Sequence, residues 1–130
     1  MGISVCLVGL GQFGSQFVEL YRAHPLVTQL AICDRDEAKL AAAATRYGIT
    51  ACYRSLDEVC RSNVQAVVLI TQPWLHAEQA LQVLRSGKHV YSAVPPVYGP
   101  DGERLLAQCD ELVRAVRETG QFYMLGETTF

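Results

Sequence analysis

The sequence lacks an excess of positive charge and lacks long apolar runs. Its 130 residues carry 11 Lys and Arg against 13 Asp and Glu, a formal net charge of −2. No basic block is present that could follow a phosphate backbone, so a nucleic-acid partner is not expected. No apolar run reaches the roughly eighteen residues of a membrane span, and no basic segment followed by a long apolar core opens the chain. We therefore expect a cytoplasmic protein without a membrane partner.

The sequence also has little that would bind a metal or form a disulfide framework. Its five cysteines are odd in number and scattered, with no CxxC pair: Cys6, Cys33, Cys52, Cys60 and Cys109. No cluster of His, Cys and Asp has metal-ligand spacing, and no local Ser-His-Asp arrangement stands out. Cys6 and Cys33 fall in predicted buried strands. We expect core thiols and no metal site.

The chain has enough apolar residues for one hydrophobic core. Half of its residues are hydrophobic, and 130 residues suffice for one ordinary domain but not for two. Strands are predicted near 3–8, 29–34, 50–53, 65–70, 88–92 and 122–125, and helices near 12–23, 37–47, 56–61, 74–86 and 102–118. This alternation predicts parallel strands joined by right-handed helical crossovers. The expected fold class is α/β, a three-layer doubly wound parallel sheet (Rossmann) with strand order 3-2-1-4-5-6, which places a ligand at the carboxyl ends of strands one and four.

Local residues mark where the helices begin and end. Asp36, Ser55 and Asp101 are placed to cap helix N-termini, and Ser55 with Glu58 matches a capping box. Gly48, Gly87 and Gly120 stand where helices should stop.

Three glycines, Gly9, Gly11 and Gly14, form a GxGxxG pattern between the first strand and the first helix. This is the context that a dinucleotide-binding turn requires. Gly9 permits a tight turn, Gly11 lets the backbone approach a pyrophosphate, and Gly14 lets the helix lie close to its strand. The phosphates would meet free N–H groups at the helix N-terminus. We expect contacts from the whole turn, which consists of Gly9, Leu10, Gly11, Gln12, Phe13 and Gly14. Glycine alone is weak evidence, since many glycine-rich turns bind nothing.

An acidic residue strengthens this interpretation. Asp34 follows the second apolar strand, twenty residues after Gly14, where a carboxylate can accept both hydroxyls of the adenosine ribose. The alternative role for Asp34 is a helix cap, which Asp36 supplies equally well. Asp34 repels a ribose 2'-phosphate and favours NAD, whereas Arg35 beside it would soften that preference. The expected cofactor is NAD, with NADP possible.

Thr71, Gln72 and Pro73 directly follow the fourth strand, where the nicotinamide half of a dinucleotide should pass. His76 comes three residues after Pro73, in the first turn of a predicted helix. It is a further candidate for cofactor contact, and a hydrogen-bonded structural histidine is an equally good interpretation.

Longer motifs in residues 69–96 resemble the N-terminal domain of the Gfo/Idh/MocA family, named for glucose-fructose oxidoreductase, inositol dehydrogenase and rhizopine catabolism. They are Thr71-Gln72-Pro73, His76-Ala77-Glu78, Ser86-Gly87-Lys88-His89-Val90 and Ala93-Val94-Pro95. In the family the last motif reads Glu-Lys-Pro, lies beside the nicotinamide, and often has a cis peptide before the proline. The resemblance therefore adds Ala93 and Val94 to the expected cofactor contacts and predicts a cis Val94–Pro95 bond. It also leaves the chain with no catalytic residue of its own, because Val94 occupies the position of the family's lysine.

The resemblance implies an oxidoreductase that moves hydride between a nicotinamide and a sugar, polyol or similar hydroxylated small molecule. Family members continue into a second domain that carries the substrate pocket, and residues 126–130 look like the crossing into it. We thus expect residues 1–130 to be the dinucleotide-binding domain of a longer protein, inactive alone and homo-oligomeric at full length. The alternative is a non-catalytic nucleotide-sensing domain, because the glycine turn also resembles the single Rossmann units attached to potassium channels and transporters.

Overall fold

The computed structural model describes residues 1–127, with strands and helices alternating along the chain. The strands are β1 (Ile3–Val8), β2 (Val27–Cys33), β3 (Cys52–Tyr53), β4 (Ala66–Leu69), β5 (His89–Ala93) and β6 (Tyr123–Gly126). The helices are α1 (Gln16–Ala23), α2 (Glu37–Tyr47), α3 (Leu56–Arg61), α4 (His76–Arg85) and α5 (Gly102–Thr119), with a 3-10 turn at Pro73–Leu75 before α4. Residues 128–130, part of the predicted crossing, lie outside the described residues.

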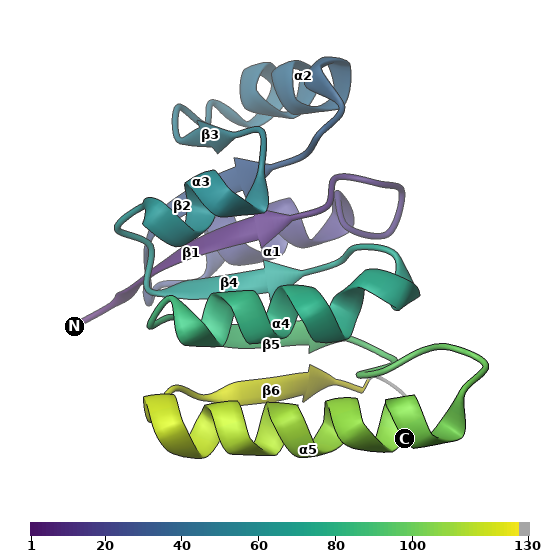
Figure 1. Ribbon diagram of the computed structural model, residues 1–130. Helices are drawn as coiled ribbons and strands as arrows, with labels where there is room; N and C mark the ends of the chain where they lie inside the picture. Colours follow the sequence, from purple (N-terminus) through teal and green to yellow (C-terminus); the bar gives the residue numbers. More distant parts are fainter. Residues whose placement is uncertain (128–130) are drawn as a thin grey trace.

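The six strands form one parallel sheet in the order β3-β2-β1-β4-β5-β6. This confirms the predicted fold class and strand order. Figure 1 shows all the arrowheads at one edge of the sheet, with the loops after β1, β4 and β5 beyond them. From β1 the strands β2 and β3 are added on one side and β4 to β6 on the other, so the strand order reverses between β1 and β4. A ligand is expected to bind at the carboxyl ends of these two strands.

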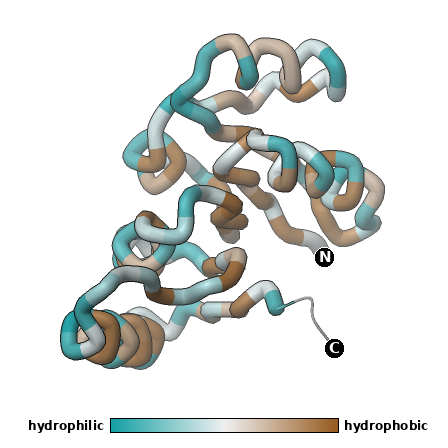
Figure 2. Tube along the Cα trace, turned by 90° about the vertical axis from the view of Figure 1, so that its right-hand side faces the viewer, coloured by the Kyte–Doolittle hydropathy of each residue, from teal (hydrophilic) through white to brown (hydrophobic). Residues whose placement is uncertain are grey.

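Helices cover both faces of the sheet. On one face, residues from α3, α4 and α5 pack against β1, β2, β4 and β5 in a cluster that includes Cys6, Leu69, Val59, Leu84 and Leu112. On the other face, Val18 of α1 and Leu40 of α2 pack on Leu7, Ile32 and Val68. Hydrophobic and hydrophilic segments alternate along the chain (Figure 2). Cys6 of β1, Ile32 of β2 and Val67 of β4 lie between the two layers and are inaccessible to water, as expected for the centre of a parallel sheet.

The helix boundaries follow the predicted caps, with one exception. Asp36 and Asp101 each accept two main-chain N–H groups at a helix start, and Gly48 and Gly120 end helices in the left-handed region with φ of 64° and 70°. The first helix begins at Gln16, not near residue 12 as predicted. Residues 11–15 form turns instead, with the Ser15 N–H donating to the Gly11 carbonyl at 2.9 Å. The glycine turn is therefore a separate loop and not the first turn of the helix.

Among the described helices, none combines the length and the apolar composition that crossing a membrane would require.

Candidate dinucleotide site

The glycine turn closes tightly against the neighbouring strand. Gly9 has a φ of 102°, and a Cβ there would collide with the carbonyl group of Ile70, whose carbon would lie 2.8 Å away. A Cβ on Gly14 would likewise collide with the Gly9 carbonyl, 3.0 Å from its carbon. Only glycine fits at these two positions, because the colliding atoms belong to main chain that cannot move aside. Both positions thus have the structural roles expected from the sequence.

Gly11 differs, because its surroundings are open. A Cβ on Gly11 would meet no atom of the described residues within 4 Å. In the same part of the chain, the main-chain N–H groups of residues 11–14 have no hydrogen-bond partner within residues 1–127. Gln12 and Phe13 are exposed between the two glycines. Unpaired amides around an open space form a cradle for an anion, and a pyrophosphate fits it without displacing a side chain.

Asp34 joins the end of β2 to this turn. One carboxylate oxygen, Oδ2, accepts the Leu10 N–H at 2.8 Å, and the other, Oδ1, accepts the Asp36 N–H at 2.8 Å. Leu10 itself is buried, and the Gly9 N–H donates to the Cys33 carbonyl at 2.9 Å. Each carboxylate oxygen keeps a free lone pair, so Asp34 can still accept ribose hydroxyls. The acid and the glycine turn are therefore in direct contact, as the dinucleotide hypothesis requires.

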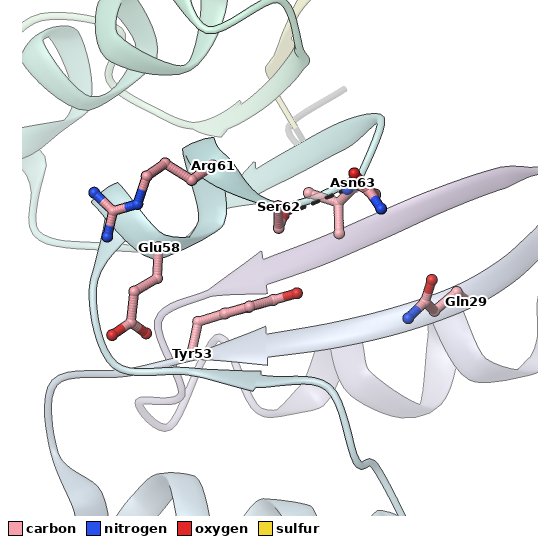
Figure 3. Close-up of a pocket in the computed structure, with 7 residues that line it drawn as sticks. Gln29, Tyr53, Glu58, Arg61, Ser62 and Asn63 are labelled. Carbon is pink, nitrogen blue, oxygen red and sulfur yellow. Dashed lines mark hydrogen bonds between the residues drawn. The ribbon is translucent and has the colours of Figure 1, made fainter.

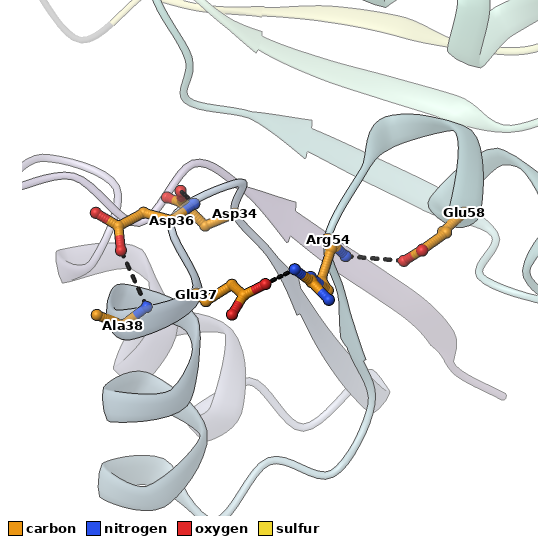
Figure 4. Close-up of polar contacts among 6 residues, drawn as sticks. All are labelled: Asp34, Asp36, Glu37, Ala38, Arg54 and Glu58. Atoms are coloured by element: carbon orange, nitrogen blue, oxygen red, sulfur yellow. Dashed lines mark hydrogen bonds and ion pairs between the residues drawn. The ribbon is translucent and has the colours of Figure 1, made fainter.

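More charged groups surround the ends of β2 and β3 (Figure 4). Arg35 is exposed next to Asp34. The guanidinium of Arg54 forms an ion pair with the Glu37 carboxylate. The main-chain N–H of Arg54 donates to the Glu58 carboxylate at 2.8 Å. Sequence reasoning missed this pair. A signal for it was present, because Arg54 follows β3 just as Asp34 follows β2, and parallel strands end at one edge of the sheet.

Burial raises the pKa of the thiol of Cys33, the residue that directly precedes Asp34. Cys33 is the last residue of β2 and 2% exposed. Loss of hydration raises the pKa of this thiol to about 12, and the negative charge of Asp34 adds to the increase. Burial also raises the pKa of Cys6 in β1 well above its usual value. These thiols are protonated core residues at neutral pH, in agreement with the sequence prediction.

The residues after β4 form the opposite side of the site. The Thr71 hydroxyl donates to the Gln79 side-chain oxygen at 2.5 Å, while Gln72 is exposed and Pro73 begins the 3-10 turn. His76, the first residue of α4, is only 1% exposed. Its Nδ1 lies 2.8 Å from the Pro95 carbonyl oxygen and its Nε2 lies 3.0 Å from the Thr71 carbonyl oxygen. The ring is thus the hydrogen-bonded histidine that the sequence allowed as the second interpretation, buried between the residues after β4 and those after β5.

Ala93 and Val94 come at the end of β5, next to the residues after β4. Ser92 pairs with Leu69 across the sheet, so the two strands end side by side. Ala93 is half-buried, Val94 is 40% exposed, and the Val94–Pro95 bond is cis, which confirms the prediction. The side chains of Ala93 and Val94 have no group that can donate or accept a proton. The predicted site residues thus all lie along one edge of the sheet, at the ends of β1, β2, β4 and β5.

Among residues 1–127, the hollows elsewhere in the molecule are lined by residues other than the predicted cofactor contacts. A hollow of about 510 Å³ lies beside α3 and is lined by Gln29, Tyr53, Glu58, Arg61, Ser62, Asn63 and Val64 (Figure 3). None of these residues was predicted to contact the cofactor. Within residues 1–127, no group of three or more His, Cys, Asp or Glu side chains is arranged to hold a metal ion.

Known proteins resemble this chain over almost all of its described residues. Residues 3–127 match the family model described as an oxidoreductase family with an NAD-binding Rossmann fold. A 4-carboxy-2-hydroxymuconate-6-semialdehyde dehydrogenase from a Sphingobium species is 30% identical over 125 residues, which are 95% of this chain and 38% of that protein. The chain thus spans little more than a third of this curated relative.

Solved structures show the same fold. The WlbA dehydrogenase from Bordetella pertussis, in complex with NADH and UDP-GlcNAcA, has a TM-score of 0.82 and 28% identity over 96% of this chain and 37% of its own. Scyllo-inositol dehydrogenase from Lactobacillus casei, with NAD(H) and scyllo-inositol, has a TM-score of 0.84 at 19% identity, covering 97% of this chain and 36% of its own. The likeness to the family extends over residues 3–127 and not only the glycine turn.

Proposed function

Since this chain belongs to the Gfo/Idh/MocA oxidoreductase family and supplies its NAD-binding Rossmann domain, we propose that it binds NAD(H) for a dehydrogenase acting on a sugar, polyol or similar hydroxylated small molecule. The observation that carries the proposal is the contact between Asp34 and the glycine turn. The Leu10 N–H donates to Asp34 beside four unpaired amides, so a ribose acceptor and a pyrophosphate cradle lie next to each other.

Each part of the dinucleotide has a place in this proposal. The glycine turn holds the pyrophosphate on the unpaired main-chain N–H groups of residues 11–14, and Asp34 accepts the adenosine ribose hydroxyls. Thr71, Gln72, Pro73, Ala93 and Val94 line the nicotinamide end. When bound, the cofactor supplies or accepts a hydride at C4 of its nicotinamide ring.

Preference for NAD over NADP follows from charge. Asp34 would face the 2'-phosphate of NADP, and Asp36 and Glu37 add two more negative charges nearby. Both cations at this end are exposed, but Arg54 is paired with Glu37, whereas Arg35 has no ion pair within residues 1–127. We expect NADH to bind more tightly than NADPH.

Catalysis requires groups from outside the described residues. Ala93 and Val94 can neither donate nor accept a proton, and the Thr71 hydroxyl donates to Gln79. An acid–base group must therefore come from the part of a longer protein that holds the substrate. The substrate class rests on the family and on the WlbA dehydrogenase, which is 28% identical and was solved with NADH and UDP-GlcNAcA. The purified 130-residue chain should bind the cofactor and oxidise nothing.

A nucleotide-sensing domain is the second candidate function. The observation that favours it is Val94, which stands where the family's motif has a lysine. Such a domain would bind NAD(H) at the same residues but would change its contacts with a partner on binding.

The test is a calorimetric titration with NADH and NADPH of the parent protein and Asp34→Ala. The substitution removes a charged acceptor of two ribose hydrogen bonds, so NADH affinity should fall about 10- to 100-fold. NADPH affinity should change less, because a repulsion is lost together with the acceptor. Tighter binding of NADPH by the parent, or an unchanged affinity in Asp34→Ala, would contradict the assignment.

A further inference from the structure

The buried ring of His76 lies between two loops that are distant in sequence. Nε2 faces the carbonyl oxygen of Thr71, which follows β4, and Nδ1 faces that of Pro95, which follows β5. The distances, 3.0 and 2.8 Å, are those of normal hydrogen bonds. At 1% exposure, the ring has no room to exchange these partners for water.

This arrangement is unusual in its chemistry. A carbonyl oxygen only accepts hydrogen bonds, and a neutral imidazole donates from one nitrogen only, whereas a protonated ring donates from both. A neutral ring donates to one of the two carbonyls and a protonated ring donates to both; in either state both nitrogens face main-chain carbonyls and neither points to a substrate or cofactor. His76 therefore cannot be a catalytic residue. Its contacts determine where the loops after β4 and β5 lie relative to each other.

The two loops carry the residues proposed to line the nicotinamide end, Thr71 to Pro73 on one side and Ala93 and Val94 on the other. Among the side chains of residues 1–126, no other makes a hydrogen bond to both loops. We propose that His76 is a positioning residue that fixes the separation of these loops, so that the nicotinamide half of the cofactor is held while the adenosine half binds independently. This inference rests on the proposed NAD(H) site.

The experiment compares two ligands that share one half. ADP-ribose has the adenosine, pyrophosphate and second ribose of NADH but no nicotinamide. In His76→Gln and His76→Phe, loss of one or two hydrogen bonds that place the loops should raise the Kd for NADH about tenfold, while the Kd for ADP-ribose changes less than about twofold. The matched control is His89→Gln. His89 begins β5 at the opposite edge of the sheet and accepts the Phe122 N–H at 3.0 Å, so its loss should leave both affinities unchanged.

A second measurement needs no ligand. Amide hydrogen exchange should increase in both residues 71–75 and residues 93–98 of His76→Gln, and in neither segment of His89→Gln. A purely structural role would lower the melting temperature and weaken NADH and ADP-ribose equally.

The outcomes separate this inference from the proposed function. If the parent binds neither NADH nor ADP-ribose, the proposed function fails. If the parent binds both, and a folded His76 variant loses both equally or neither, only the role of His76 is wrong. If neither His76 variant unfolds cooperatively, His76 supports the fold as a whole and the positioning role is wrong as well.

Discussion

The two ends of the candidate site are built differently. The adenosine end consists of main-chain amides, the Asp34 carboxylate and surrounding charges, all from residues between β1 and α3. The nicotinamide end consists of two loops with mostly apolar side chains, held by one buried imidazole. The adenosine end offers hydrogen-bonding groups to a ligand, whereas the nicotinamide end offers mostly apolar contact surface. We therefore expect most of the binding affinity to come from the adenosine end and the acid–base group for hydride transfer to come from further residues at the nicotinamide end.

The largest expected effect concerns the glycine turn. Gly9→Ala places a methyl group against the Ile70 carbonyl at a φ of 102°, which should lower the free energy of unfolding by roughly 2–5 kcal/mol. Urea denaturation followed by circular dichroism would measure this loss. Binding of both NADH and ADP-ribose should disappear with it.

Gly11→Ala is the matched variant that separates binding from folding. Its methyl group would meet no described atom within 4 Å, so the unfolding midpoint should stay close to that of the parent. The methyl group would, however, stand where the pyrophosphate approaches, and NADH binding should fall by at least about tenfold. A Gly11→Ala protein that binds NADH as the parent does would show that the phosphates bind elsewhere.

The next effect concerns the buried thiol of Cys33 and the pH dependence of the free energy of unfolding. Because the pKa of Cys33 is raised from 9.0 to about 12, the folded protein keeps a proton that the unfolded chain loses above pH 9. This contribution to stability is complete below about pH 9 and is lost as the pH rises toward 12, at about 1.4 kcal/mol per pH unit. Cys33→Ala should remove that part of the slope.

Urea denaturation at intervals from pH 7 to pH 11 would test this predicted contribution of Cys33 to the pH dependence of stability. The curves of the parent and Cys33→Ala should run parallel between pH 7 and 8 and converge above pH 9. Both should keep a residual alkaline slope, since burial also raises the pKa of Tyr21 to about 12. Parallel curves throughout would mean that Cys33 is more hydrated than the structure shows.

The smallest expected effect concerns cofactor preference. Glu37→Gln would release the Arg54 guanidinium, which could then pair with a 2'-phosphate next to the ribose. Both side chains are about two-thirds exposed, so water and salt weaken the effect. We expect NADPH affinity to rise about two- to fivefold at low salt with NADH unchanged. Glu37→Gln combined with Arg54→Ala should return the NADPH affinity to the parent value, and persistence of the gain would exclude Arg54 as its source.

The sequence predicted the sheet, its strand order and the glycine turn because these depend on local pattern. Apolar strands, helix caps such as Asp36, and glycines at Gly9 and Gly14 each have one physical interpretation at short range. The start of the first helix was placed too early because Phe13 continues the helical spacing of Phe17, Leu20 and Tyr21. What opposes a helix there is the turn itself, which Gly9 and Gly14 close against Ile70.

Contacts between distant segments could not be predicted in the same way. His76 was a candidate on its position alone, and nothing in the sequence indicates that its ring meets the carbonyls of Thr71 and Pro95. Lys88 belonged to a motif known only by resemblance. In the structure it is 7% exposed, and its Nζ donates to the carbonyls of Ser62 and Val64 at 2.7 and 2.8 Å. His76 and Lys88 both contact main-chain carbonyl oxygens. Every residue has such an oxygen, so the type of the partner residue gives no signal in the sequence.

The hydrogen bond from Leu10 to Asp34 has a consequence for the thermodynamics of binding. A carboxylate on a free side chain would lose rotational freedom when a ribose arrives, and a free loop would lose still more. Here both are already oriented, so little conformational entropy remains to be lost. Adenine nucleotides without a nicotinamide, even AMP, should therefore meet a rigid receptor and bind with a small entropic penalty.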